Sequence, residues 1–192
     1  MFSEIKKISS LLLSVAFSSI GFIASITVTV LAAREVSSNP LFVGFPNAVG
    51  VGGAVLGTRM IYLISKTNSQ LNALAFTFLI GAFGGAIMFY SLIIDSFLLL
   101  LLGAFILGIG QSATLQTRYA ASFVAGTKFK ATALSLAVWF SVFGSVFGPR
   151  MVGSYSNFFE NIFNSDLIVG YVIAFVGMLF AAASLFTFTS KK

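Results

Sequence analysis

The chain has 192 residues, of which 58% are hydrophobic and only 8% are charged, and its formal net charge is +6. This composition excludes a water-soluble globular domain, in which about a quarter of the residues are charged, and it predicts a helical protein embedded in lipid. The sequence contains no Cys and no His, which excludes disulfide scaffolds, Cys/His metal sites and catalysis by a Cys nucleophile or a His acid–base group. The basic residues stand singly or in pairs between apolar runs, so the positive charge does not indicate nucleic-acid binding.

Six apolar segments are long enough to cross a bilayer, which takes about 20 residues of helix. Short polar stretches separate them, and Ser96 is placed to cap the start of the fourth. We therefore expect an all-α integral membrane protein with a single six-helix transmembrane domain over residues 1–192. We interpret the first span as a retained helix, because it is too long for the core of a signal peptide. The predicted helices cover about 8–33, 41–64, 73–94, 97–121, 131–153 and 167–189.

Lys and Arg residues are distributed unevenly between the two ends of these spans. If the N-terminus lies inside, eight basic residues fall on the inner side and only Arg34 and Arg150 on the outer side. The positive-inside rule then predicts a multi-pass protein of the plasma membrane with both termini in the cytoplasm. The inner group is Lys6, Lys7, Lys66, Arg118, Lys128, Lys130, Lys191 and Lys192.

The first span carries small or hydroxyl residues along one face, because successive members stand three or four positions apart. We favour tight helix packing as their role, with the hydroxyls bonded to carbonyls of their own helix. The alternative is the polar wall of a substrate pathway, for which Ser18 and Ser25 are the candidates. The stripe consists of Ser14, Ser18, Gly21, Ser25 and Thr29.

The second span is rich in glycine, which permits close approach between helices. Pro46 stands in its first turns, where the missing N–H of proline costs least. The next residue, Asn47, is a candidate pathway contact, although we favour a hydrogen bond between helices.

The fourth span contains the clearest polar face. Gln111, Thr114 and Arg118 are spaced by three and four, so they lie on one side of a helix. Polar side chains at this depth are expected to face protein or a water-filled cavity. Arg118 lies nearer the inner surface, where we favour an anchor that extends to the interface over an inner gate or an anion-attracting residue.

The fifth span contains Trp139, which lies too deep for an interfacial belt and either lines a cavity or packs. Gly148 and Pro149 are expected to bend or loosen the helix near its outer end, and we take Pro149 to mark the end of that helix. Gly144 and Gly148 also form a close-packing motif. No Asp, Glu or Lys stands near the middle of any span, so the chain offers no titrating carboxylate for proton coupling.

These residues resemble the major facilitator superfamily of transporters. The stretches 108–113 and 115–121 read GIGQSA and LQTRYAA, and they are similar to the fourth helix of that family and its inner end. The stretch 133–139, ALSLAVW, then leads into Gly144, Gly148, Pro149 and Gly153, which resembles the fifth-helix antiporter motif. Six helices with both termini inside resemble the N-terminal half of the family's fold, which implies a 3+3 inverted repeat.

Two departures from the family pattern stand out. The loop between the second and third helices usually carries a Gly, Asp, Arg, Gly, Arg pattern, whereas residues 62–70 keep a single charge, Lys66. The Arg that the family places four residues before its Gly-x-Gly is Ala104 here. In the family, the loop charges imply a conformational latch and the Arg is associated with proton coupling, so the resemblance implies neither here.

The leading functional hypothesis is a half-size permease that moves a small solute by alternating access. A full member of the family has two six-helix halves, so the resemblance implies a partner, either a second copy or a separate C-terminal half. The alternative is a non-transporting membrane subunit or a truncated remnant of a split transporter. An enzyme and a channel are disfavoured, because the sequence shows neither a nucleophile–base pair nor a filter signal. We expect no cofactor, no metal and no nucleic acid, and we expect the lipid bilayer and a small, neutral or amphiphilic substrate as partners.

Overall fold

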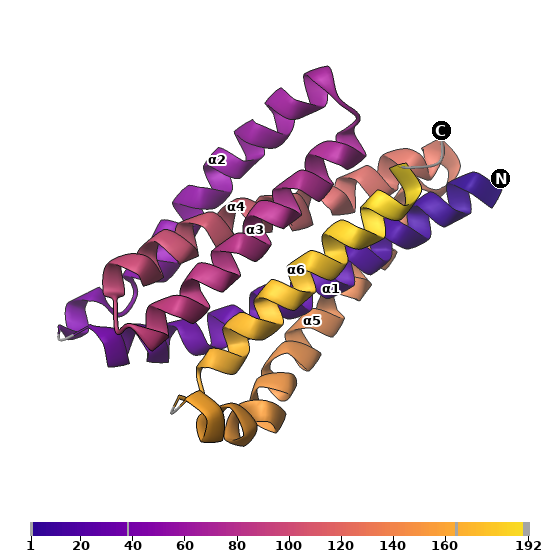
Figure 1. Ribbon diagram of the computed structural model, residues 1–192. Helices are drawn as coiled ribbons and strands as arrows, with labels where there is room; N and C mark the ends of the chain where they lie inside the picture. The colour runs from indigo at the N-terminus through magenta and orange to yellow at the C-terminus, as the bar shows by residue number, and fades with distance from the viewer. Residues whose placement is uncertain (1, 38, 164, 190–192) are drawn as a thin grey trace.

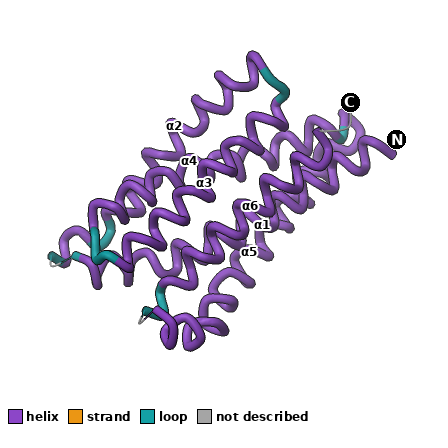
Figure 2. The backbone as a smooth tube through the Cα atoms, viewed as in Figure 1, coloured by secondary structure: helices purple, strands orange, loops and turns teal. Residues whose placement is uncertain are grey.

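The computed structural model describes residues 2–37, 39–163 and 165–189, and this part of the chain is almost entirely helical (Figures 1 and 2). All six α-helices are long and apolar enough to cross a membrane. The predicted all-α, six-helix membrane bundle is therefore confirmed. The elements are α1 (Phe2–Val36), the short 3₁₀ helix η1 (Pro40–Phe42), α2 (Phe45–Thr67), α3 (Gln70–Ile93), α4 (Phe97–Val124), α5 (Gly126–Phe163) and α6 (Ile168–Thr189).

Side chains at the helix starts explain where two of these helices begin. Ser96 precedes α4 with an extended backbone, and its hydroxyl accepts a hydrogen bond from the Leu99 amide at 3.4 Å. Ser69 plays the same part at α3, accepting from the Asn72 amide at 3.3 Å. Such caps satisfy amides that have no partner within the helix. The predicted cap at Ser96 is confirmed.

The helices pack in two groups. α4 packs against α2 and α3, and α1 packs against α5 and α6. Contacts of α3 with α6 and of α1 with α4 join the groups, so α2 and α5 lie at opposite edges of the bundle (Figure 1). The start of α1 and the end of α6 lie at the same end of the bundle. Large buried side chains such as Phe78, Leu100 and Tyr171 fill its interior.

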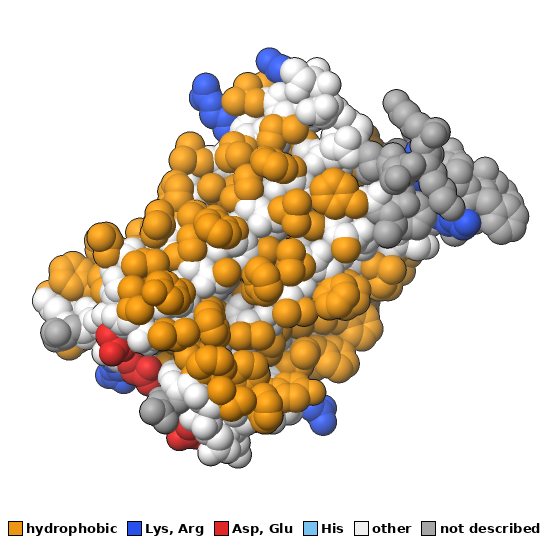
Figure 3. Space-filling model, in the orientation of Figure 1, with side chains coloured by type: hydrophobic (Ala, Val, Ile, Leu, Met, Phe, Trp, Pro, Cys, Tyr) orange, Lys and Arg blue, Asp and Glu red, His pale blue; other side chains and the backbone are white. Residues whose placement is uncertain are grey.

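Apolar side chains also cover the outside of the bundle. On the face shown in Figure 3 they spread over the middle, while the charged side chains stand at the two ends. Leu98 and Val55 are 77% and 68% exposed. Exposed apolar area on this scale marks a surface that meets lipid or another protein.

The fifth helix differs from its predicted form. α5 runs without interruption from Gly126 to Phe163, beyond the predicted 131–153, and Pro149 lies inside it. The expectation that Pro149 ends the fifth helix is wrong. A proline removes one backbone donor and crowds the carbonyl four residues earlier, which bends a helix without stopping it when the following residues can continue the turns.

Glycines bring the backbones of α2 and α4 into direct contact. A Cβ atom added at Gly53 would overlap the Phe105 carbonyl of α4 and lie 2.9 Å from its carbon. One added at Gly57 would lie 2.7 Å from the Ile109 carbonyl oxygen. Neither position has room for a side chain, so close approach between the two helices requires glycine there.

The same arrangement joins α5 to α1. A Cβ atom at Gly144 would lie 2.6 Å from the Ser19 carbonyl carbon, and one at Gly148 would lie 3.0 Å from the Ala24 amide nitrogen. The predicted packing motif of Gly144 and Gly148 is thus used for close contact with α1. Any role of these glycines in bending or gating stays a prediction.

We expect Gly53→Ala to lower the free energy of unfolding in detergent by about 1–3 kcal/mol, because the methyl group must push α2 away from α4. Gly52→Ala is the matched control, since a Cβ atom at Gly52 meets nothing within 4 Å. Thermal unfolding of both variants checks this. Equal melting temperatures for Gly53→Ala and Gly52→Ala would contradict the glycine contact.

Candidate functional site

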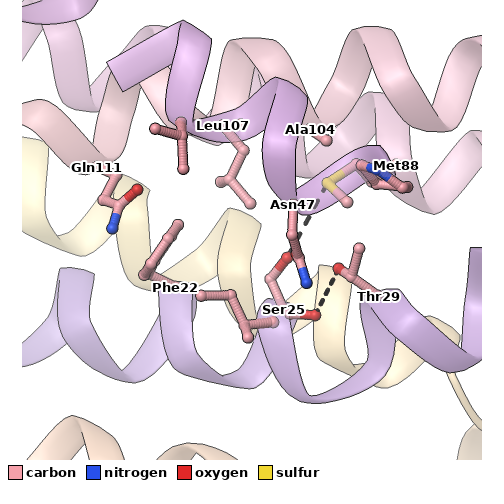
Figure 4. Close-up of a pocket in the computed structure, with 12 residues that line it drawn as sticks. Phe22, Ser25, Thr29, Asn47, Met88, Ala104, Leu107 and Gln111 are labelled. Atoms are coloured by element: carbon pink, nitrogen blue, oxygen red, sulfur yellow. Dashed lines mark hydrogen bonds between the residues drawn. The ribbon is translucent and has the colours of Figure 1, made fainter. Parts of the chain in front are cut away.

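A pocket of about 260 Å³ lies where α1, α2, α3 and α4 meet. α1 and α4 supply its long walls, α2 covers it from the side, and α3 contributes a single side chain, Met88 (Figure 4). Of the predicted pathway residues, Ser25, Asn47 and Gln111 line it, so the structure brings together candidates from three different helices. The full lining is Phe22, Ser25, Ile26, Thr29, Pro46, Asn47, Gly50, Val51, Met88, Ala104, Leu107 and Gln111.

The hydroxyl groups of the pocket are engaged within the protein. Thr29 donates to the Ser25 carbonyl at 2.7 Å, and Ser25 contacts the Met88 sulfur at 4.0 Å. Tyr171 of α6 donates to the Thr29 hydroxyl at 3.5 Å behind the pocket wall. These bonds use the O–H donors of the α1 wall and leave its hydroxyls only acceptor capacity for a solute.

The two side-chain amides of the pocket differ from these hydroxyls in their hydrogen bonding. Asn47 reaches from α2 toward Ser25 and Thr29, and Gln111 lies at the other end beyond Phe22 (Figure 4). Neither side-chain amide has a hydrogen-bond partner within the described part of the chain. The interhelical hydrogen bond that we favoured for Asn47 is therefore absent among the residues that the structure describes. Each amide offers two donors and an acceptor to a bound molecule.

The remaining lining is apolar and carries no charge. Phe22 and Leu107 stand between the two amides, and the methyl group of Ala104 occupies the position at which the family places an Arg. None of the lining residues has a titratable side chain. The pocket therefore combines apolar surface with two hydrogen-bonding groups, which is a typical composition for the recognition of small molecules.

Ser18 lies outside this pocket. Its side chain is fully buried, and its hydroxyl donates to the Val15 carbonyl of the same helix at 3.3 Å. Ser14 is bonded in the same way to Leu11 at 2.8 Å. This arrangement agrees with the packing interpretation of the stripe on α1, and only its Ser25 and Thr29 end faces the pocket.

The three residues of the predicted polar face of α4 lie in different surroundings. Gln111 lines the pocket, whereas Thr114 is 4% exposed with a hydroxyl that has no hydrogen-bond partner among the described residues. Arg118 is half-buried, and its Nε atom is likewise without a partner there. Its position seven residues after Gln111 continues the line of Ala104, Leu107 and Gln111 by two helical turns.

Trp139 does not line this pocket. Its side chain is 67% exposed on α5, beside Phe143 and Phe147 on the outer surface of the bundle. Trp139 therefore lines neither the pocket between α1 and α4 nor the buried core, and it presents a large apolar ring to lipid or to a partner. Pro149 is also exposed on α5.

Sequence patterns missed most of the apolar lining of the pocket. Met88 of α3 and Phe22 of α1, for example, lie in apolar runs with nothing to distinguish them from lipid-facing neighbours. Their role follows from the crossing of α1, α3 and α4. Among the residues that the structure describes, no group of His, Cys, Asp or Glu is placed to hold a metal ion.

Comparison with known proteins agrees with the sequence resemblance. The chain is 30% identical over 174 residues to the uncharacterized MFS-type transporter YdeG of Bacillus subtilis, which covers 91% of this chain and 40% of the relative. It is 30% identical over 183 residues to the uncharacterized MFS-type transporter YddS of the same organism, with 95% of this chain and 42% of the relative covered. The chain thus spans about two fifths of the length of these curated relatives. No protein-family model and no solved structure matches it.

The resemblance to the major facilitator superfamily is confirmed by these two relatives together with the six-helix bundle. The protein is a multi-pass membrane protein similar to one half of a transporter of that family.

The pocket predicts a contrast in chemical accessibility between two positions. The sequence contains no native Cys, so single-cysteine variants report cleanly. We expect Asn47→Cys to react with a water-soluble thiosulfonate about tenfold faster than Ser18→Cys, because thiol reactivity follows exposure and Ser18 is fully buried. Mass spectrometry of the labelled protein in detergent gives both rates, and equal rates would rule out an aqueous pocket at Asn47.

Proposed function

We propose that the chain forms one half of a membrane transporter that moves a small solute by alternating access. The observation that carries this proposal is the pocket between α1, α2 and α4, in which the amides of Asn47 and Gln111 have no partner within the described chain. Both residues are half-buried, and their amides face a cavity instead of a protein partner, so they are placed to form hydrogen bonds with a molecule that enters it. The two relatives, both named MFS-type transporters, support transport as the outcome of that binding.

The helix pairing supports an inverted repeat of α1–α3 and α4–α6. α1 packs on α5 and α6 as α4 packs on α2 and α3. Under this correspondence α2 matches α5, and each uses two glycines four residues apart: Gly53 and Gly57 against α4, and Gly144 and Gly148 against α1. Transporter sites lie where such repeats meet, and the pocket borders both α1 and α4.

The lining favours an uncharged or amphiphilic solute. A charged solute needs an opposite charge or a dense set of hydrogen bonds when it leaves water, and the lining supplies no ionic group. Phe22, Leu107 and Val51 would contact the apolar part of the solute, while Asn47 and Gln111 would bond its polar groups. We assign Arg118, two turns beyond Gln111, to the inner approach to the pocket.

The pathway requires a second half. In α2 only 17% of the 18-residue apolar stretch is buried inside the bundle, and in α5 only 22%. In each of the other four helices about half of the corresponding stretch is buried. These two helices also stand at the edges of the bundle (Figure 1). We propose that a second copy or a separate six-helix half covers the pocket side of the bundle, in a plasma membrane with both chain termini in the cytoplasm.

The alternative is a non-transporting subunit or a truncated remnant. The single charge in residues 62–70 and the presence of Ala104 favour it, because both depart from the family pattern.

Native mass spectrometry in detergent tests whether the chain assembles with a second half. A dimer, or a complex with a second six-helix protein, supports the half-transporter, and a strictly monomeric chain that still transports contradicts the need for a second half.

Substitution of Gln111 gives a direct test of the pocket. A thermal-shift screen of the purified protein against uncharged amphiphilic compounds identifies a stabilising ligand, since a ligand that binds the folded state raises its stability. We expect Gln111→Leu to lower the affinity for that ligand by about five- to tenfold, because a hydrogen bond between uncharged groups contributes about 1 kcal/mol.

The matched control is Gln116→Leu, the same change on the same helix outside the pocket lining. Loss of binding in both variants, or stabilisation only by a charged sugar acid, would contradict the proposed site.

A further inference from the structure

The last part of α5 extends past the membrane-spanning length of that helix. Residues 131–149, between Lys130 and Arg150, carry no charge. At 1.5 Å per residue this stretch is about 28 Å long, close to the hydrocarbon thickness of a bilayer. This length predicts that Arg150 stands at the membrane surface. The helical residues 150–163, which we call the α5 tail, continue beyond it.

The α5 tail turns back onto the bundle instead of projecting away from it. The Phe163 ring at its end packs edge-to-face on Phe89 of α3, with centroids 5.5 Å apart. Phe89 lies one turn before the end of α3, so the end of the tail lies beside the last turn of a spanning helix. Val152 and Phe159 of the tail also pack against the hydrophobic core. Figure 1 shows the orange end of α5 curving below the start of α6.

The tail has one apolar face that the bundle leaves uncovered. Tyr155, Phe158 and Ile162 are spaced by three and four, so they form a line along the helix. They are 51%, 60% and 56% exposed. The side away from this line and from the bundle is polar and exposed, and it consists of Ser154, Asn157, Glu160 and Asn161.

An apolar groove of about 360 Å³ begins at the same face. Tyr155 and Phe159 of the tail form one edge, and residues of α1 and α6, such as Phe17 and Val176, form the other. Apart from the Tyr155 phenol, the lining side chains contain no polar group. The groove thus runs from the tail along the membrane-spanning part of the bundle.

We propose that the α5 tail is an interfacial lipid-binding segment. Tyr155, Phe158 and Ile162 insert at the boundary between the headgroups and the acyl chains of one leaflet, Asn157 and Asn161 face water, and an acyl chain of a phospholipid occupies the groove. Helices with one apolar and one polar face lie in this way in the plane of a membrane. The tail carries only Arg150 and Glu160 as charges, so a zwitterionic phospholipid suffices.

A nitroxide scan tests this arrangement in the intact protein. The chain has no native Cys, so single cysteines at positions 153–163 are labelled without background. The protein is placed in phosphatidylcholine nanodiscs, and collision with oxygen and with a water-soluble nickel chelate is measured. The expected result is high oxygen access at 155, 158 and 162 and high nickel access at 154, 157 and 161.

Two outcomes overturn the proposal. High nickel access at 155, 158 and 162 would place the tail in water, and low access to both reagents there would mean that protein covers this face.

If a cysteine variant does not fold, the lipid contact is measured by tryptophan fluorescence instead. In a Trp139→Phe background, brominated phosphatidylcholine should quench Phe158→Trp several-fold more than the neighbouring Asn157→Trp. Equal quenching at these two positions would also overturn the proposal.

Discussion

The fold depends on the contact of helix backbones through glycine. In a membrane, lipid tails are as apolar as leucine side chains, so burial of apolar area gives helices little reason to associate. Close contact restores an attraction, because many small dispersion terms add up when backbones touch. Gly53 and Gly57 provide this contact for α2 on α4, and Gly144 and Gly148 provide it for α5 on α1. The two edge helices are thereby held on the two helices that wall the pocket.

This packing also explains the character of the pocket. α3 and α6 bury apolar side chains in the interior, whereas α1 and α4 cross with room left between them and α2. Several serine and threonine hydroxyls on α1 donate to carbonyls of their own helix, as Thr29 does to Ser25. The side-chain amides of Asn47 and Gln111 make no hydrogen bond within the described part of the chain, so under the proposed function they can bond a solute.

The sequence predicted the helices and part of the site. Runs of apolar residues of the required length define the six spans, because hydrocarbon forces every backbone group in them into a helix. The position of Gln111 on a buried polar face also followed from helical spacing. Met88 and Phe22 did not follow, because an apolar residue that lines a pocket has the same local pattern as one that meets lipid. Thr114 shares the predicted face of Gln111, yet the crossing of its neighbours buries it outside the pocket lining.

Pro149 shows a second limit of local patterns. A proline near the outer end of an apolar run suggests a helix end, yet α5 continues to Phe163. The continuation depends on the contacts of Val152, Phe159 and Phe163 with the bundle, and these involve residues far away in the sequence. Trp139 is a similar case, because its exposure on α5 depends on how the helices pack and not on the local sequence.

The most direct test of this structure is thiol crosslinking across the pocket wall. The Ser25 hydroxyl of α1 and the Met88 sulfur of α3 lie 4.0 Å apart, so a short bis-thiosulfonate reagent should crosslink the two cysteines of a Ser25→Cys, Met88→Cys variant within one chain. The exposed Thr27 provides the control, in which Thr27→Cys with Met88→Cys should give little crosslink. An equal or higher yield in the control would contradict the arrangement of helices from which the pocket and its proposed transport role follow.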